Sequence, residues 1–247
     1  MVGRFPVIRI VTVLAMALLA GIPARAQEFW EKKPYTEWSK QECERLLRDS
    51  PWAKTFTISA VRQDRFGQPT KGESRQTEQR IFYYAQLRSA LPVRQAVVRL
   101  SQIEGKYDKM STADKQAFDQ SANRYLNAQY PEIVVHIDYS SDVEFFDKEL
   151  ANHWQSRQPQ EMINSNVYLT TSRGTRVSPI SFTAPRGAAR AFEFVFPRLH
   201  NGEPLITANV ESIRIEFPNP QIRELNDQRT TFEFRTDKMK YKGAIIY

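Results

Sequence analysis

The last third of the chain constrains the fold more than any other region, because it is a succession of short segments with β-strand character. In each segment apolar residues alternate with polar ones, or β-branched and aromatic residues are enriched, and turn residues such as Asn201-Gly202 lie between segments. The expected strands are 167–171, 177–183, 191–196, 205–210, 213–217, 231–235 and 239–247. Their close spacing predicts hairpin connections and therefore antiparallel pairing.

The first part of the chain mixes the periodicities of strands and helices. Alternation predicts strands at 54–61, 81–88 and 133–139, whereas apolar residues recur at helical spacing in 39–48, 92–103, 111–126 and 141–154. Three of the expected helices begin at a serine with an acidic residue three positions later, a pair that satisfies backbone N–H groups at a helix start. These pairs are Ser39 with Glu42, Ser111 with Asp114, and Ser141 with Glu144.

This order of elements predicts an α+β fold. We expect an antiparallel β-sandwich, immunoglobulin-like (Ig-like) or similar, with an N-terminal capped helix and a helical insertion of two to three helices. We also expect a single domain over 27–247. The alternative is an α+β part at 27–158 followed by a β domain at 159–247, and pairing of early strands with late ones would favour the single domain.

Residues 1–26 have the three parts of a signal peptide. Arg4 and Arg9 precede a 13-residue apolar run at 10–22, and Ala24-Arg25-Ala26 suits signal peptidase. The run is too short to cross a bilayer of about 30 Å as a helix. The sequence therefore predicts export to the periplasm or the extracellular space, with no transmembrane segment in the mature chain.

The charge of the expected mature chain is concentrated in one stretch. The leader holds three arginines and no acidic residue, so its removal lowers the formal net charge from +7 to +4, and residues 155–190 alone account for +4. Arginine binds oxyanions through its planar fork, which makes this stretch a candidate binding region for an anionic polymer or a protein of the cell envelope. Nucleic acid is not an expected partner, because export is expected and the chain has no nucleic-acid-reading motif. The candidate residues are Arg173, Arg176, Arg186 and Arg190.

Few residues suggest catalysis or metal binding. The single Cys43 excludes an internal disulfide and a cysteine-cluster zinc site, and no glycine-rich nucleotide-binding motif occurs, so no cofactor is expected. His136 and Asp138 stand two apart on an expected strand and share a face, where a carboxylate can orient an imidazole. Glu149 and His153 stand four apart on an expected helix and are the candidates for a metal site.

Three functions are compatible with these features. We favour an exported, soluble, non-enzymatic binding or interaction module of the bacterial cell envelope, because catalytic motifs are lacking. The alternative is a hydrolase with an Asp/Glu/His site, with or without a metal. The third is an outer-membrane-associated protein, since Met239, Tyr241, Ile245 and Tyr247 alternate to the last residue.

One segment resembles a known group of proteins. It runs from Trp38-Ser39 through Leu46-Leu47 to Asp49-Ser50-Pro51-Trp52-Ala53. It is similar to the W-[ST]-x-x-E-x-x-x-L-L-x-D-S-P-W-A stretch that begins an uncharacterised family of exported bacterial proteins. That family has no assigned activity, so the resemblance implies export and a shared fold and indicates no catalytic residue.

Overall fold

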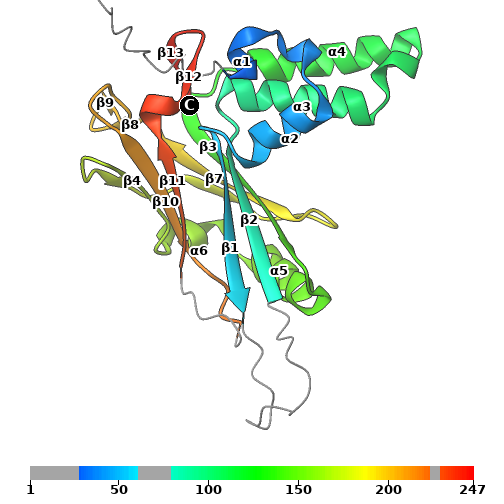
Figure 1. Cartoon of the computed structure of the whole chain (residues 1–247). Helices are drawn as coiled ribbons and strands as arrows, with labels where there is room; N and C mark the ends of the chain where they lie inside the picture. Colours follow the sequence, from blue (N-terminus) through cyan, green and yellow to red (C-terminus); the bar gives the residue numbers. More distant parts are fainter. Residues whose placement is uncertain (1–27, 61–78, 223–228) are drawn as a thin grey trace, which may run out of the picture.

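The structure is a computed structural model that describes residues 28–60, 79–222 and 229–247 (Figure 1). The expected signal peptide lies outside the described residues. The α-helices of the described residues are α1 (Phe29–Lys32), α2 (Lys40–Arg48), α3 (Leu91–Glu104), α4 (Thr112–Asn127), α5 (Glu144–Ser156) and α6 (Pro159–Asn164). Short 3-10 turns occur at Tyr35–Glu37, Tyr107–Lys109 and Thr236–Lys238. No helix in the described ranges combines the length and apolar character needed to cross a membrane.

Two antiparallel sheets carry most of the strands. Sheet A has the order β1 (Ala53–Ala60), β2 (Gln79–Leu87), β3 (Glu132–Ser141), β7 (Ala191–Pro197), β6 (Ser181–Thr183). Sheet B has the order β11 (Arg229–Arg235), β10 (Ser212–Pro218), β4 (Tyr168–Thr171), β5 (Arg176–Val177). Two hairpins complete the described strands, β8 (Leu199–His200) with β9 (Glu203–Pro204) and β12 (Lys240–Tyr241) with β13 (Ala244–Ile245). The predicted α+β class with antiparallel sheets is confirmed.

Aromatic side chains join the two sheets in one hydrophobic core. Tyr83 on β2 and Phe192 on β7 meet Phe217 on β10, with ring centroids 5.4 and 5.7 Å apart. Trp154 of α5 stacks on Phe192 at 4.0 Å, so this helix belongs to the same core. Because β3 pairs with β7, strands from before and after residue 158 share sheet A.

The helices α1 to α4 lie together at one end of the sheets, close to the β12–β13 hairpin (Figure 1). The predicted cap of α2 is present, because Ser39 and Glu42 each accept a hydrogen bond from the other's backbone N–H. Trp38 and Trp52 are fully buried, and the Trp52 Nε1 donates to the carbonyl of Ile246 at 2.6 Å. This bond connects the start of sheet A to the last residues of the chain.

The helix α4 is less buried than predicted. The expected stripe of Phe118, Ala122, Tyr125 and Leu126 is only half-buried, and α4 contains no fully buried residue. The helix packs on α3 at the edge of the molecule, so its apolar side chains are covered on one side only. A buried arginine of α3, Arg94, holds the end of α4 through hydrogen bonds to the carbonyls of Tyr125, Leu126 and Ala128.

Several predicted strands were wrong in extent. The expected strand 177–183 divides at Pro179 into β5 and β6, which belong to different sheets, since proline cannot donate a ladder hydrogen bond. No strand forms at 205–210, and 239–247 contains only the two short strands of a hairpin. The turn of that hairpin needs the left-handed backbone of Lys242 and Gly243, at φ 50° and 80°.

Two helix boundaries also differ from expectation. The helix predicted from Ser141 begins at Glu144, because Ser141 is the last residue of β3 and its hydroxyl accepts from the N–H of Val143. Pro159, expected only to interrupt the chain, is the first residue of α6, a position that proline's fixed φ favours.

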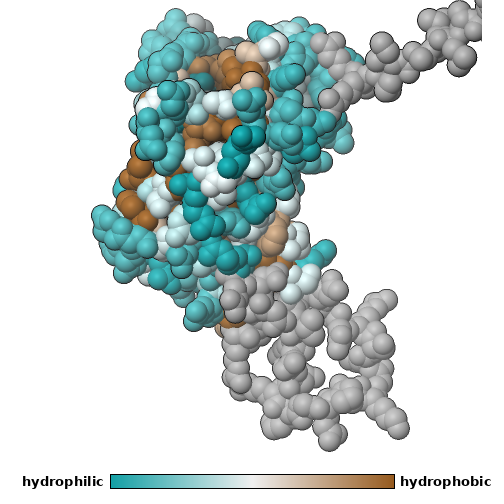
Figure 2. Space-filling model, turned by 90° about the vertical axis from the view of Figure 1, so that its left-hand side faces the viewer, coloured by the Kyte–Doolittle hydropathy of each residue, from teal (hydrophilic) through white to brown (hydrophobic). Residues whose placement is uncertain are grey.

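The surface is hydrophilic over most of the side that carries β4, β8 and β9, with apolar patches mainly in its upper half (Figure 2). Four large hydrophobic side chains are exposed among the described residues. They are Phe145, Ile180, Leu199 and Ile245. They come from four separate elements or connections, so no single element presents an apolar stripe to solvent.

Candidate functional site

The outer face of sheet A, the face turned away from the core, places polar side chains from three strands in one row. Gln86 on β2 lies opposite His136 on β3, and His136 lies opposite Glu193 on β7. Directly opposed residues in antiparallel strands share a face, with Cβ atoms about 5 Å apart. Asp138, two residues after His136, is on the same face. We refer to His136, Asp138 and Glu193 as the His136 cluster.

His136 bonds to a carboxylate on each side of its ring. Its Nδ1 lies 2.9 Å from Oε1 of Glu193, and its Nε2 lies 3.4 Å from Oδ1 of Asp138. The side chain of His136 is 19% exposed, compared with 43% for Asp138 and 37% for Glu193. The sequence predicted the proximity of His136 and Asp138, but it gave no sign of Glu193, because the pairing of β3 with β7 joins residues far apart in the chain.

The neighbouring charges change the protonation of the cluster. Burial alone would lower the pKa of His136, but its hydrogen bonds to Asp138 and Glu193 outweigh burial and raise that pKa above its ordinary value. The bond to His136 lowers the pKa of Glu193, against the opposing effect of burial. Arg88 at the end of the face also favours the ionised form of Glu193. The arrangement therefore stabilises an imidazolium between two carboxylates.

Such a cluster is suited to holding charge in place rather than to activating a nucleophile. Within the described ranges no hydroxyl or thiol is hydrogen-bonded to the imidazole of His136, and both ring nitrogens face carboxylates. Nucleophilic catalysis needs the base within hydrogen-bond reach of the group it activates. Gln86 closes one side of the cluster, donating to the carbonyl of Leu47 at 3.1 Å and to Asp138 at 3.5 Å.

A row of aromatic and guanidinium groups stands on the same face, along β2. Phe82 and Tyr84 are stacked with centroids 6.3 Å apart, and both are half-buried. The Arg80 guanidinium lies over Phe82 at 5.5 Å, and that of Arg48, from the end of α2, lies over Tyr84 at 5.3 Å. We call these four residues the β2 ladder. Two aromatic residues at the outward positions of an alternating strand were the sequence signal for it.

The two residues considered for a metal site are not a metal centre by themselves. His153 is paired through Nδ1 with the guanidinium of Arg157 at 3.0 Å. Burial, helped by Arg157, lowers the pKa of His153 to about 4. Glu149 is exposed. Among the described residues no group of three or more His, Cys, Asp or Glu side chains is placed to hold a metal ion.

The four candidate arginines belong to different parts of the fold. Arg176 is on β5, 4.0 Å from Glu216 of β10 and 4.4 Å over the ring of Tyr168. Arg190 precedes β7 and pairs with Asp147 of α5 at 2.5 Å. Arg173 lies in the turn between β4 and β5, and Arg186 in the connection from β6 to β7. The excess of positive charge in the sequence is thus divided between the two sheets.

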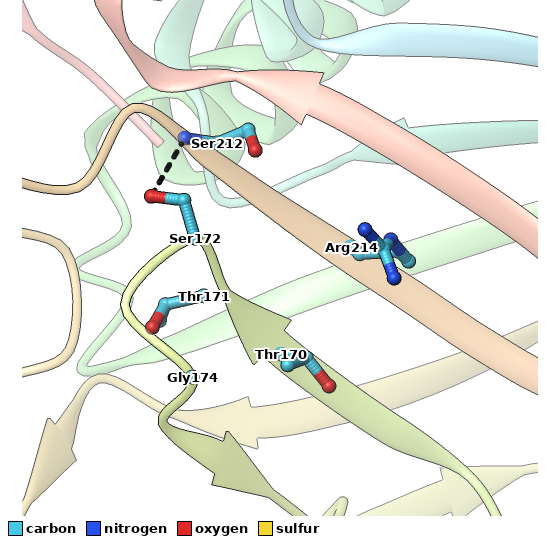
Figure 3. Close-up of a pocket in the computed structure, with 6 residues that line it drawn as sticks. All are labelled: Thr170, Thr171, Ser172, Gly174, Ser212 and Arg214. Carbon is cyan, nitrogen blue, oxygen red and sulfur yellow. Dashed lines mark hydrogen bonds between the residues drawn. The ribbon is translucent and has the colours of Figure 1, made fainter.

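A polar hollow of about 230 Å³ lies on sheet B beside the β4–β5 turn (Figure 3). Its lining consists of Thr170, Thr171, Ser172, Gly174, Ser212 and Arg214. A second hollow of about 180 Å³ lies between α3 and α4 and is lined by residues such as Val97 and Phe118. Both are smaller than the roughly 300–1,000 Å³ typical of pockets that enclose drug-sized ligands. Each is large enough for a single chemical group.

Comparisons of the chain with models of protein families, with curated proteins and with solved structures find no match.

Proposed function

We propose that this chain is an exported, soluble protein of the bacterial cell envelope that acts as a non-enzymatic binding module. Its two sheets would form a β-sandwich, and the outer face of sheet A would bind a protein partner. The leader at 1–26 and the resemblance of the Trp38 to Ala53 segment to exported proteins support the location. The β2 ladder is the observation that carries the proposal for binding.

The composition of the β2 ladder is that of an interface centre. Tyrosine, tryptophan and arginine dominate the residues that contribute most to protein association. Phe82 and Tyr84 remain half-buried on a face whose other strands present mostly polar side chains, and Arg48 has no carboxylate within ion-pair distance in the described ranges. The ring stacking and the two guanidinium contacts limit the movement of these side chains, so less side-chain entropy is lost on binding.

The His136 cluster supports binding more than hydrolysis. Its charges compensate one another, and no nucleophile is bonded to His136 among the described residues. Asp138 is the most exposed member and lies opposite Tyr84 on the neighbouring strand. It would therefore add a polar, charged contact beside the β2 ladder, at the rim of the proposed interface.

Site-specific photocrosslinking in the native envelope tests this function. A photoreactive residue replaces Thr57, which is exposed and lies opposite Phe82, and a second variant carries it at Thr231 on sheet B. We expect one protein adduct from position 57 that is absent from position 231. Adding Tyr84→Ala should weaken its capture about tenfold, because truncation of a central interface residue costs roughly 1–2 kcal/mol.

A matched control uses the other arginine in the last turn of α2. Arg45 also lies over aromatic rings, those of Phe29 and Trp30, but it is not part of the β2 ladder. Arg45→Ala should leave the adduct unchanged, whereas Arg48→Ala should reduce it. Loss of the adduct in both variants, or an adduct that is insensitive to Tyr84→Ala, would overturn the proposed interface.

A further inference from the structure

We propose that the hollow on sheet B is a binding site for a tetrahedral oxyanion, the phosphate group of a free or polymer-linked ligand. The site consists of the guanidinium group of Arg214 and the hydroxyl of Thr170, both of which line the hollow, with Arg176 on the neighbouring strand β5 as a second arginine within reach. It is on a different sheet from the β2 ladder, so it is independent of the proposed function.

The register of sheet B brings these three side chains together. Thr170 on β4 lies directly opposite Arg176 of β5 on one side and Arg214 of β10 on the other. All three point to the outer face, because their sequence neighbours Leu169, Val177 and Ile213 point into the core. The two arginine backbones are two strand spacings apart, about 10 Å. The Arg176 guanidinium lies over the ring of Tyr168, so it must turn away from that ring to meet a ligand over Thr170.

Two polar groups at the hollow lack a protein partner. Arg214 is exposed, and its guanidinium has no ion pair or hydrogen bond in the described part of the chain. The hydroxyl oxygen of Thr170 is buried and has no hydrogen-bond partner there. A buried hydroxyl without a partner costs about 1–3 kcal/mol, so a ligand oxygen that bonds to it would recover that cost. The Arg214 side chain must shift to admit the ligand, and no ion pair is broken when it does.

The rim of the hollow is rigid. The Thr171 hydroxyl accepts hydrogen bonds from the N–H groups of Arg173 and Thr175, at 3.3 and 3.2 Å. The Ser172 hydroxyl accepts from the N–H groups of Glu211 and Ser212, and a dashed line marks the second bond in Figure 3. These hydroxyls fix the β4–β5 turn to the start of β10. The site therefore needs little reorganisation apart from the side chains of Arg214 and Arg176.

The charges around the hollow favour an anion. Arg173, in the turn between β4 and β5, is a third exposed arginine on this part of sheet B. Two glutamates compete for these arginines: Glu216 lies 4.0 Å from Arg176, and Glu233 lies opposite Arg214 on β11. Glu233 makes no ion pair among the described residues, and 4.0 Å is at the limit of an ion pair. Arg173 and Arg214 have no ion pair among the described residues, and guanidinium forks match phosphate oxygens in geometry.

Titration with inorganic phosphate at constant ionic strength, followed by calorimetry and by NMR, tests the site. We expect saturable binding to the purified mature chain that weakens about tenfold or more in Arg214→Gln, because a charge-assisted contact is lost. Thr170→Val removes only the hydroxyl and keeps the β-branched shape, so it should weaken binding about threefold or more while the strand is retained. Arg235→Gln is the matched control: it removes the same charge from the same face of sheet B, at an arginine paired with Asp237. Arg235→Gln should change the affinity for phosphate by less than about twofold.

A second arm identifies the source of the phosphate. Cosedimentation with vesicles of phosphatidylglycerol, compared with phosphatidylcholine vesicles, detects a lipid headgroup as the ligand. Phosphate binding without cosedimentation indicates a soluble or polymer-linked phosphate. Phosphate binding or cosedimentation supports the site if it is lost in Arg214→Gln and kept in Arg235→Gln. The proposal is overturned if neither probe binds, or if the two arginine variants weaken binding equally.

Discussion

The Nδ1 of His136 lies 2.9 Å from Oε1 of Glu193, and this contact joins the first part of the chain to its last third across the β3–β7 pair. The pKa of His136 is raised in the folded protein by Asp138 and Glu193, in spite of its burial. A histidine whose folded pKa is raised stabilises the fold below its unfolded pKa, and this contribution is lost as the pH rises through the folded value.

We therefore predict that the free energy of unfolding decreases as the pH rises from about 6 to 8, the interval around the ordinary histidine pKa. His136→Gln should flatten this dependence, because a neutral amide replaces the imidazolium. Chemical denaturation at a series of pH values measures the slope. His200→Gln, on the exposed β8 strand, should keep the wild-type slope. Equal slopes in wild type and His136→Gln would contradict the prediction.

Arg94 should be among the most important side chains for the position of α4. Its guanidinium donates to three carbonyls at the end of α4, at 2.7 to 3.0 Å, and α4 has no fully buried residue of its own. Arg94→Met should lower the free energy of unfolding by about 2 kcal/mol, because three acceptors lose a charged donor. Hydrogen exchange should show the largest loss of protection in α4. Arg124→Met, on the exposed surface of the same helix, should have little effect.

The Ser39 cap should stabilise the whole molecule, since α2 buries Cys43 and Leu46 in the core. Ser39→Ala should cost about 1 kcal/mol in global stability, whereas Ser39→Asp should retain most of it, because both serine and aspartate accept the backbone hydrogen bond. The equivalent cap of α4, Ser111, serves a helix without a buried residue. Ser111→Ala should therefore reduce hydrogen-exchange protection in α4 more than it lowers the midpoint of denaturation. A loss in Ser39→Asp as large as in Ser39→Ala would exclude the capping mechanism.

Local features of this fold were predictable from the sequence because their causes are local. The Ser39–Glu42 cap, the alternation along β3 and the Asn201-Gly202 turn, with φ of 53° and 84°, all follow from short-range rules. The break between β5 and β6 could also have been predicted, because Pro179 has no backbone N–H to donate to a sheet. Apolar residues alternate with polar ones on both sides of this proline, so the two strands look like one longer strand in the sequence.

The residues that form the candidate sites were only partly predictable, because register joins positions far apart in the chain. His136 and Asp138 are two apart on one strand, so their common face could be inferred, whereas Glu193 depends on the pairing of β3 with β7. Likewise, the arginine-rich stretch indicated Arg176, but Arg214 joins it only through the order β10-β4-β5 in sheet B. Charge clustering in the sequence is therefore a poor guide to charge clustering on a folded β surface.

Cys43 should report on opening of the helical end of the molecule. Its side chain is fully buried on α2, and burial raises the pKa of its thiol to about 11. At about pH 8, near the ordinary thiol pKa, the native protein should react very slowly with a thiol reagent, because the thiol is both inaccessible and protonated. It should react fully after unfolding in guanidinium chloride. Ser39→Ala should speed native labelling about fivefold, the change expected when local opening becomes about 1 kcal/mol easier. Rapid labelling of the wild-type protein would show that α2 is not packed as described.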